Sequence, residues 1–78
     1  MTEPMQQWVI YDHPVDFPEH YVVRCWVIGP GAPPGHTGEA WLRDSLDGAR
    51  EVIAANYPGG YRLNRQPGDD PVIVEVWI

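Results

Sequence analysis

Proline and glycine are the residues that most constrain how this chain folds. Nine prolines and eight glycines are spread over 78 residues, and both residue types interrupt helices and strands. The segments between them are short and rich in β-branched and aromatic residues, which is typical of strands. The chain therefore predicts a single small domain, residues 1–78, built from short elements joined by turns.

Four segments carry the composition of strands, at residues 7–12, 20–28, 39–43 and 72–78. Residues 39–43 are also compatible with a helix, because Glu, Ala, Leu and Arg are good helix formers. We favour a strand there, since a separate helix start follows it. Residues 61–65 are a further candidate for a short extended piece.

One helix is predicted from Leu46 to about Asn56. Ser45 or Asp44 can cap its first turn, and proline and glycine at residues 58–60 end it. Arg50 is expected to face water. The apolar side chains recur at helical spacing, at Leu46, Ala49, Val52, Ile53 and Tyr57.

The order of elements is β-β-β-α-β, which predicts an α+β fold. We expect an antiparallel sheet of three or four strands with the helix packed on one face. Residues 1–6 and the Gly/Pro-rich loop at 29–38 are expected to be flexible.

Side chains alternate between the two faces of a strand. The smoother aliphatic positions are predicted to pack against the helix: Val9, Tyr11, Val23, Cys25, Val27, Ala40, Leu42, Val72, Val74 and Val76. The opposite face then gathers the four tryptophans and two arginines. This predicted partner-binding surface consists of Trp8, Trp26, Trp41, Trp77, Arg24 and Arg43.

Such a face exposes more apolar area than the few hundred Å² of a usual monomer patch. Another segment of the chain, a protein partner or a second copy of the chain could cover it. Tryptophan, tyrosine and arginine are enriched at interface hot spots. We therefore expect a non-catalytic protein-interaction module, with a homodimer slightly favoured over other partners.

The charge balance bears on the type of partner. Eleven acidic residues face five arginines and no lysine, for a net charge of −6, which argues against general nucleic-acid binding. The alternative is a module that stacks single-stranded bases on the tryptophans beside Arg24 and Arg43. An inhibitor-like role against a basic partner would use acidic side chains, namely Asp12, Asp16, Glu19, Asp44, Asp47, Asp69 and Asp70.

Catalytic, metal and cofactor sites are not predicted. Cys25 is the only cysteine, and its spacing to His13, His20 and His36 fits no compact metal-ligand pattern. No complete set of nucleophile, base and orienting group is present in the sequence pattern. A leader peptide and a membrane-spanning segment are also not expected, so the expected location is cytoplasmic.

Two resemblances carry further expectations. Residues 11–18, 21–24 and 69–78 resemble a family of small bacterial proteins without an assigned activity, which implies a bacterial, cytoplasmic protein and leaves phage association open. Asp44-Ser45-Leu46-Asp47 and the final strand are similar to the N-terminal domain of HicB-type antitoxins. That likeness implies the same topology and a last strand that supports dimerisation. Gly48, where that family has an acidic residue, and the loop at 29–38 depart from its pattern.

Overall fold

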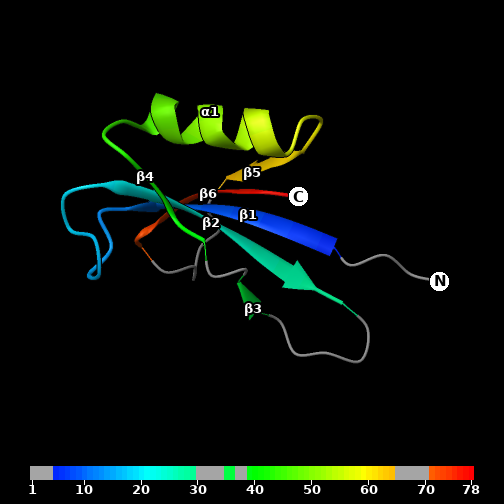
Figure 1. The fold of residues 1–78 in the computed structure, drawn as a ribbon, viewed down its shortest axis with the longest axis horizontal. Coiled ribbons are helices and arrows are strands. Elements are labelled where there is room, and N and C mark those ends of the chain that lie inside the picture. Colours follow the sequence, from blue (N-terminus) through cyan, green and yellow to red (C-terminus); the bar gives the residue numbers. More distant parts are fainter. Residues whose placement is uncertain (1–4, 30–34, 37–38, 65–70) are drawn as a thin grey trace.

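A computed structural model describes residues 5–29, 35–36, 39–64 and 71–78. One helix lies across one face of an antiparallel sheet (Figure 1), as predicted for an α+β fold. The elements of the described residues are β1 (Met5–Asp12), β2 (Tyr21–Ile28), β3 (Gly35–His36), β4 (Trp41–Arg43), α1 (Leu46–Asn56), β5 (Arg62–Asn64) and β6 (Ile73–Trp77). β5 falls within the candidate extended piece at residues 61–65, whereas the very short β3 was not predicted.

The strand order is β3-β2-β1-β6-β5, and β4 also pairs with β2. The longest ladder joins β1 to β2, from Met5 opposite Ile28 to Asp12 opposite Tyr21. β4 and β3 pair with successive stretches of β2, so together they form one edge of the sheet. β5 is the outermost strand on the other side (Figure 1).

The helix begins and ends where the sequence predicts. Ser45 has an extended backbone, and its Oγ accepts a hydrogen bond from the Gly48 N–H at 3.0 Å. The Tyr57 N–H donates to the carbonyl of Ile53 at 2.7 Å. Both ends therefore satisfy backbone groups that lack partners within the helix.

The core lies between α1 and the sheet. Ala49, Val52 and Ile53 of the helix pack against four buried residues of β1 and β2, which are Trp8, Ile10, Val23 and Cys25. Directly opposed residues of neighbouring strands share a face, and the register puts Trp8 opposite Cys25 and Ile10 opposite Val23. The helix therefore packs against the face of β1 that carries Trp8 and Ile10. The prediction that Val9 and Tyr11 face the helix is wrong.

A bulge changes the alternation in β6. Ile10 lies opposite Glu75 and Tyr11 lies opposite Ile73, so Val74 is an extra residue without a partner position. Val74 and Trp77 both pack against the core, while Val76 lies opposite Val9 on the other face. The predicted aliphatic face of the last strand is thus divided between the two sides of the sheet.

The connection between β1 and β2 contacts the sheet face away from the helix. Val9 and Val22 are buried on that face, and Arg24 beside them reaches Asp16 of this connection at 2.7 Å. The ring of Phe17 lies 6.0 Å from the same guanidinium. Part of the sheet face away from the helix is therefore covered by another segment of the same chain. This is one of the ways of covering that face that the sequence analysis expected.

The predicted flexible stretches fall largely outside the described residues. Of residues 1–6, Met5 and Gln6 belong to β1. Of the loop at 29–38, Gly35–His36 form β3 beside β2. In the described part of the chain, no helix has the length and apolar character needed to cross a bilayer.

Candidate functional site

The structure divides the predicted partner-binding surface between the two faces of the sheet. Trp8, Trp41 and Trp77 lie on the helix side, where all three contact the core. Trp26 lies on the other side, and its Nε1 donates to the hydroxyl of Tyr11 at 3.1 Å. The prediction of one shared tryptophan face is therefore wrong, because β1, β4 and the end of β6 were each assigned to the wrong side. Leu42, predicted to face the helix, lies opposite Val22 on the other side of the sheet.

Trp8 is the centre of an aromatic cluster on the helix side. Its ring centroid lies 5.3 Å from that of Trp41 and 6.2 Å from that of Tyr57. Its Nε1 donates to Gln6 Oε1 at 3.1 Å, which holds the orientation of the indole. Trp8 itself is buried, so it serves the core and cannot present a broad surface to a partner.

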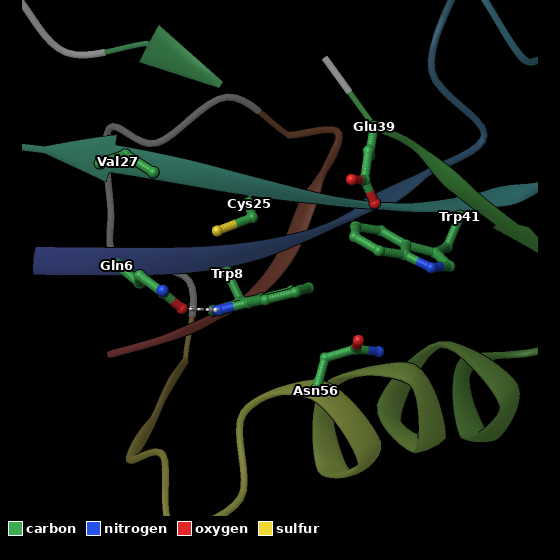
Figure 2. Close-up of a pocket in the computed structure, with 7 residues that line it drawn as sticks. All are labelled: Gln6, Trp8, Cys25, Val27, Glu39, Trp41 and Asn56. Carbon is green, nitrogen blue, oxygen red and sulfur yellow. Dashed lines mark hydrogen bonds between the residues drawn. The ribbon is translucent and has the colours of Figure 1, made fainter. Parts of the chain in front are cut away.

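A cavity of about 270 Å³ opens beside this cluster, between the last turn of α1 and the sheet (Figure 2). We call it the helix-side cavity. Figure 2 shows Glu39 and Asn56 projecting towards its tryptophans from opposite sides. The lining residues are Gln6, Trp8, Cys25, Val27, Glu39, Trp41 and Asn56.

Two side chains bring oxygen acceptors to this cavity, the Glu39 carboxylate and the Asn56 amide. Asn56 Nδ2 donates to the Val52 carbonyl at 2.8 Å, which leaves Oδ1 for the cavity. Burial raises the pKa of the Cys25 thiol, and the negative charge of Glu39 raises it further. The negative charge of Glu39 is therefore felt at Cys25 inside the cavity, and no arginine is among the described lining residues.

A second cavity, of about 360 Å³, lies on the other face of the sheet beside Arg24 and Trp26. Arg24 Nη2 donates to Asp16 Oδ2 at 2.7 Å, and the side chain is mostly buried. The charge of Arg24 is therefore neutralised within the chain. The lining residues are Tyr11, Pro14, Val15, Asp16, Arg24, Trp26 and Val72.

Arg43, the last of the predicted site residues, lies at the β4 edge. It is opposite Tyr21 in the ladder with β2. Its Nη1 donates to the carbonyl of Leu42, the preceding residue, at 2.8 Å. The Arg43 guanidinium thus binds a backbone carbonyl of its own strand, and it does not form a shared basic site with Arg24.

Glu75 is a buried carboxylate that the sequence analysis did not single out. Arg50 donates to both of its oxygens, with Nη2 to Oε2 at 2.5 Å. Trp77 Nε1 donates to Oε1 at 3.3 Å, and Arg62 Nη1 lies 3.6 Å from Oε2. Arg50, expected to face water, instead reaches back under the helix, because β6 presents Glu75 to α1.

Burial opposes ionisation of Glu75, but the hydrogen bonds from Arg50 and Trp77 and the charges of Arg50 and Arg62 outweigh it. The pKa of Glu75 is therefore lowered. The same hydrogen bond raises the pKa of Arg50. This arrangement keeps both groups charged at neutral pH, which suits a structural ion pair rather than a proton-transfer site.

Three exposed apolar side chains lie on or beside β5, the outermost strand among the residues that the structure describes. Tyr61 is 70% exposed, Leu63 37% and Ile78 38%. The N–H of Tyr61 donates to the Ile78 carbonyl, and the N–H of Ile78 donates back. We call Tyr61, Leu63 and Ile78, with the backbone of β5, the β5 edge.

Most of the predicted acidic candidates have local partners. Asp12 contacts His13, Asp16 pairs with Arg24, and Asp47 lies 3.7 Å from Arg50. Asp44 Oδ1 is 3.3 Å from His20 Nδ1. Asp69 and Asp70 lie outside the described residues. Among the residues that the structure describes, no group of three or more His, Cys, Asp or Glu side chains could hold a metal ion.

Comparisons with protein-family models, with curated proteins and with solved structures find no match to this chain. The two resemblances drawn from the sequence therefore stay predictions. The candidate sites rest on geometry alone.

Proposed function

We propose that this protein is a non-catalytic interaction module that forms a homodimer through the β5 edge. The observation that carries this proposal is the exposure of Tyr61, Leu63 and Ile78 beside an outer strand. Unpaired strand edges are templates for pairing with another chain. Tyrosine is also one of the residue types enriched at interface hot spots.

The backbone of β5 points towards a second strand. Tyr61 and Ile78 exchange both of their backbone hydrogen bonds, so the next residue, Arg62, directs its N–H and C=O away from β6. Alternation also separates the side chains. Arg62 reaches Glu75 on the helix side, whereas Tyr61 and Leu63 lie on the opposite side with Ile78.

A second copy of the chain fits this edge by symmetry. If two β5 strands pair antiparallel about Leu63, Arg62 of one copy lies opposite Asn64 of the other, and no like charges meet. Three residues supply few backbone hydrogen bonds. The apolar contacts of Tyr61, Leu63 and Ile78 therefore contribute most of the association free energy.

The β4 edge is less suited to the same role. The Arg43 guanidinium occupies the Leu42 carbonyl, and charged side chains at an edge are a common device against strand pairing. β5 also carries an arginine, but Arg62 is directed to Glu75 on the helix side of the sheet. This contrast supports the β5 edge over the β4 edge.

The two narrower alternatives receive less support. A platform for single-stranded nucleic acid needs exposed tryptophans and unpaired arginines, but Trp8 is buried and Arg24 is paired with Asp16. An inhibitor of a basic partner needs available carboxylates, and four of the candidates have partners within the chain.

Sedimentation velocity of the wild type and two variants tests the proposal. Leu63→Glu places a charge in the β5 edge, and Leu42→Glu is the matched control, because Leu42 is 36% exposed at the other edge. We expect a dimer for the wild type and for Leu42→Glu, and a folded monomer for Leu63→Glu by circular dichroism. A monomeric wild type, or equal dissociation of both variants, contradicts the proposal.

A further inference from the structure

We propose that the helix-side cavity binds the ammonium group of a small organic cation. Among the residues that the structure describes, the lining combines two indole rings with a carboxylate and contains no cationic side chain. Aromatic faces attract cations through their negative quadrupole. This site lies on the helix side and is independent of the β5 edge.

The aromatic wall is held in place before any ligand arrives. Trp8 and Trp41 contact each other with their rings tilted by 38°. Trp8 is further fixed by Gln6 at its indole nitrogen and by the ring of Tyr57. Because Trp8 is buried, the half-buried Trp41 supplies most of the aromatic surface that a cation can reach. A wall that is already ordered loses little conformational entropy when a ligand binds.

The oxygen atoms around the cavity suit a cation. Glu39 takes part in no ion pair among the described residues, and it projects over Trp41 (Figure 2). The amide nitrogen of Asn56 donates to a carbonyl of the helix, so its amide oxygen is oriented towards the cavity. Gln6 accepts from Trp8 through its oxygen, which leaves the donors of its amide nitrogen on the lining.

The size and opening of the cavity limit the ligand. About 270 Å³ accommodates a trimethylammonium group with a short chain, and it lies just below the usual range of small-molecule sites, about 300–1,000 Å³. The net charge of −6 also attracts cations to the protein. An ammonium group can come from a free metabolite or from a lysine side chain of another protein, and both offer the same chemistry.

Titrations followed by tryptophan fluorescence and by the indole N–H signals of Trp8 and Trp41 test this site. The probes are choline, Nα-acetyl-lysine methylamide with a free side-chain ammonium, and the neutral alcohol that carries a tert-butyl group in place of the trimethylammonium group of choline. We expect saturable binding of at least one cation, and about tenfold weaker binding of the neutral isostere. The stronger of the two cations identifies the source of the ligand.

Variants separate the site from a general effect of charge. Glu39→Gln keeps the shape of the side chain and is expected to weaken cation binding about tenfold. Glu19→Gln changes the net charge equally at an exposed residue in the connection between β1 and β2, and it is expected to leave binding unchanged. Absence of saturation for both cations, equal binding of the neutral isostere, or equal effects of the two variants overturns the proposal.

Discussion

Arg50 of α1 and Glu75 of β6 form a two-pronged ion pair that ties the helix to the sheet. Arg50 Nη2 lies 2.5 Å from Glu75 Oε2, and Nε lies 3.1 Å from Oε1. The side chain of Glu75 is only 4% exposed, whereas Arg50 is 37% exposed. The arginine therefore keeps part of its hydration while it neutralises a buried carboxylate.

Glu75→Gln is expected to lower the free energy of unfolding by about 1–3 kcal/mol. The amide keeps an acceptor for Trp77 but loses the charge that Arg50 and Arg62 neutralise. Urea unfolding followed by tryptophan fluorescence measures the change. Glu51→Gln, at an exposed helix position, is the control and is expected to stay within about 0.5 kcal/mol of the wild type.

The contribution of Glu75 to stability depends on pH in a defined direction. Its pKa in the folded state is lowered, so its stabilising effect is fully present above the unfolded value of about 4.3. The effect is lost as the pH falls through the folded pKa. The difference in unfolding free energy between the wild type and Glu75→Gln should therefore shrink in acid, and a difference that stays constant would contradict this assignment.

Ser45→Ala is expected to destabilise the protein by about 1 kcal/mol. The hydroxyl accepts the Gly48 N–H, and alanine leaves that donor without the cap. Ser45→Asp retains an acceptor and adds a negative charge near the positive end of the helix dipole, so it should remain close to the wild type. Thermal unfolding of the three proteins measures both changes, and equal loss in Ser45→Ala and Ser45→Asp would argue against the cap.

The helix was the most predictable element, because its signals are local. Ser45 at the start and proline with glycine after Tyr57 define the bounds of α1. The long strands were predictable from their composition for a similar reason. β3 consists of Gly35–His36 alone, and its pairing with β2 has no counterpart in local composition.

The candidate sites were less predictable, because strand alternation divides side chains into two sets without saying which set meets the helix. In β1 both sets are apolar, with Trp8 and Ile10 on one side and Val9 and Tyr11 on the other. The extra residue Val74 then shifts the alternation in β6. Pairing between distant strands decides which face of β1 meets the helix and which residues of β6 lie on that face. The same pairing brings Glu75 to Arg50.

The proposed homodimer predicts a specific response to salt. Each copy carries a net charge of −6, and repulsion between the two copies is screened as ionic strength rises. Dimerisation through apolar side chains should therefore strengthen between about 0.05 M and 0.5 M salt. Sedimentation equilibrium at both concentrations measures the dissociation constant, and weaker association at high salt would point to ionic contacts instead.

Amide hydrogen exchange at Arg62 is the most direct test of pairing through the β5 edge. The Arg62 N–H points away from β6, so it is open to solvent in a monomer, while the Leu63 N–H faces β6 and serves as the internal reference. The proposal predicts that exchange at Arg62 slows as protein concentration rises and the dimer forms, with little change at Leu63. Fast exchange at Arg62 at concentrations where sedimentation shows a dimer would contradict it.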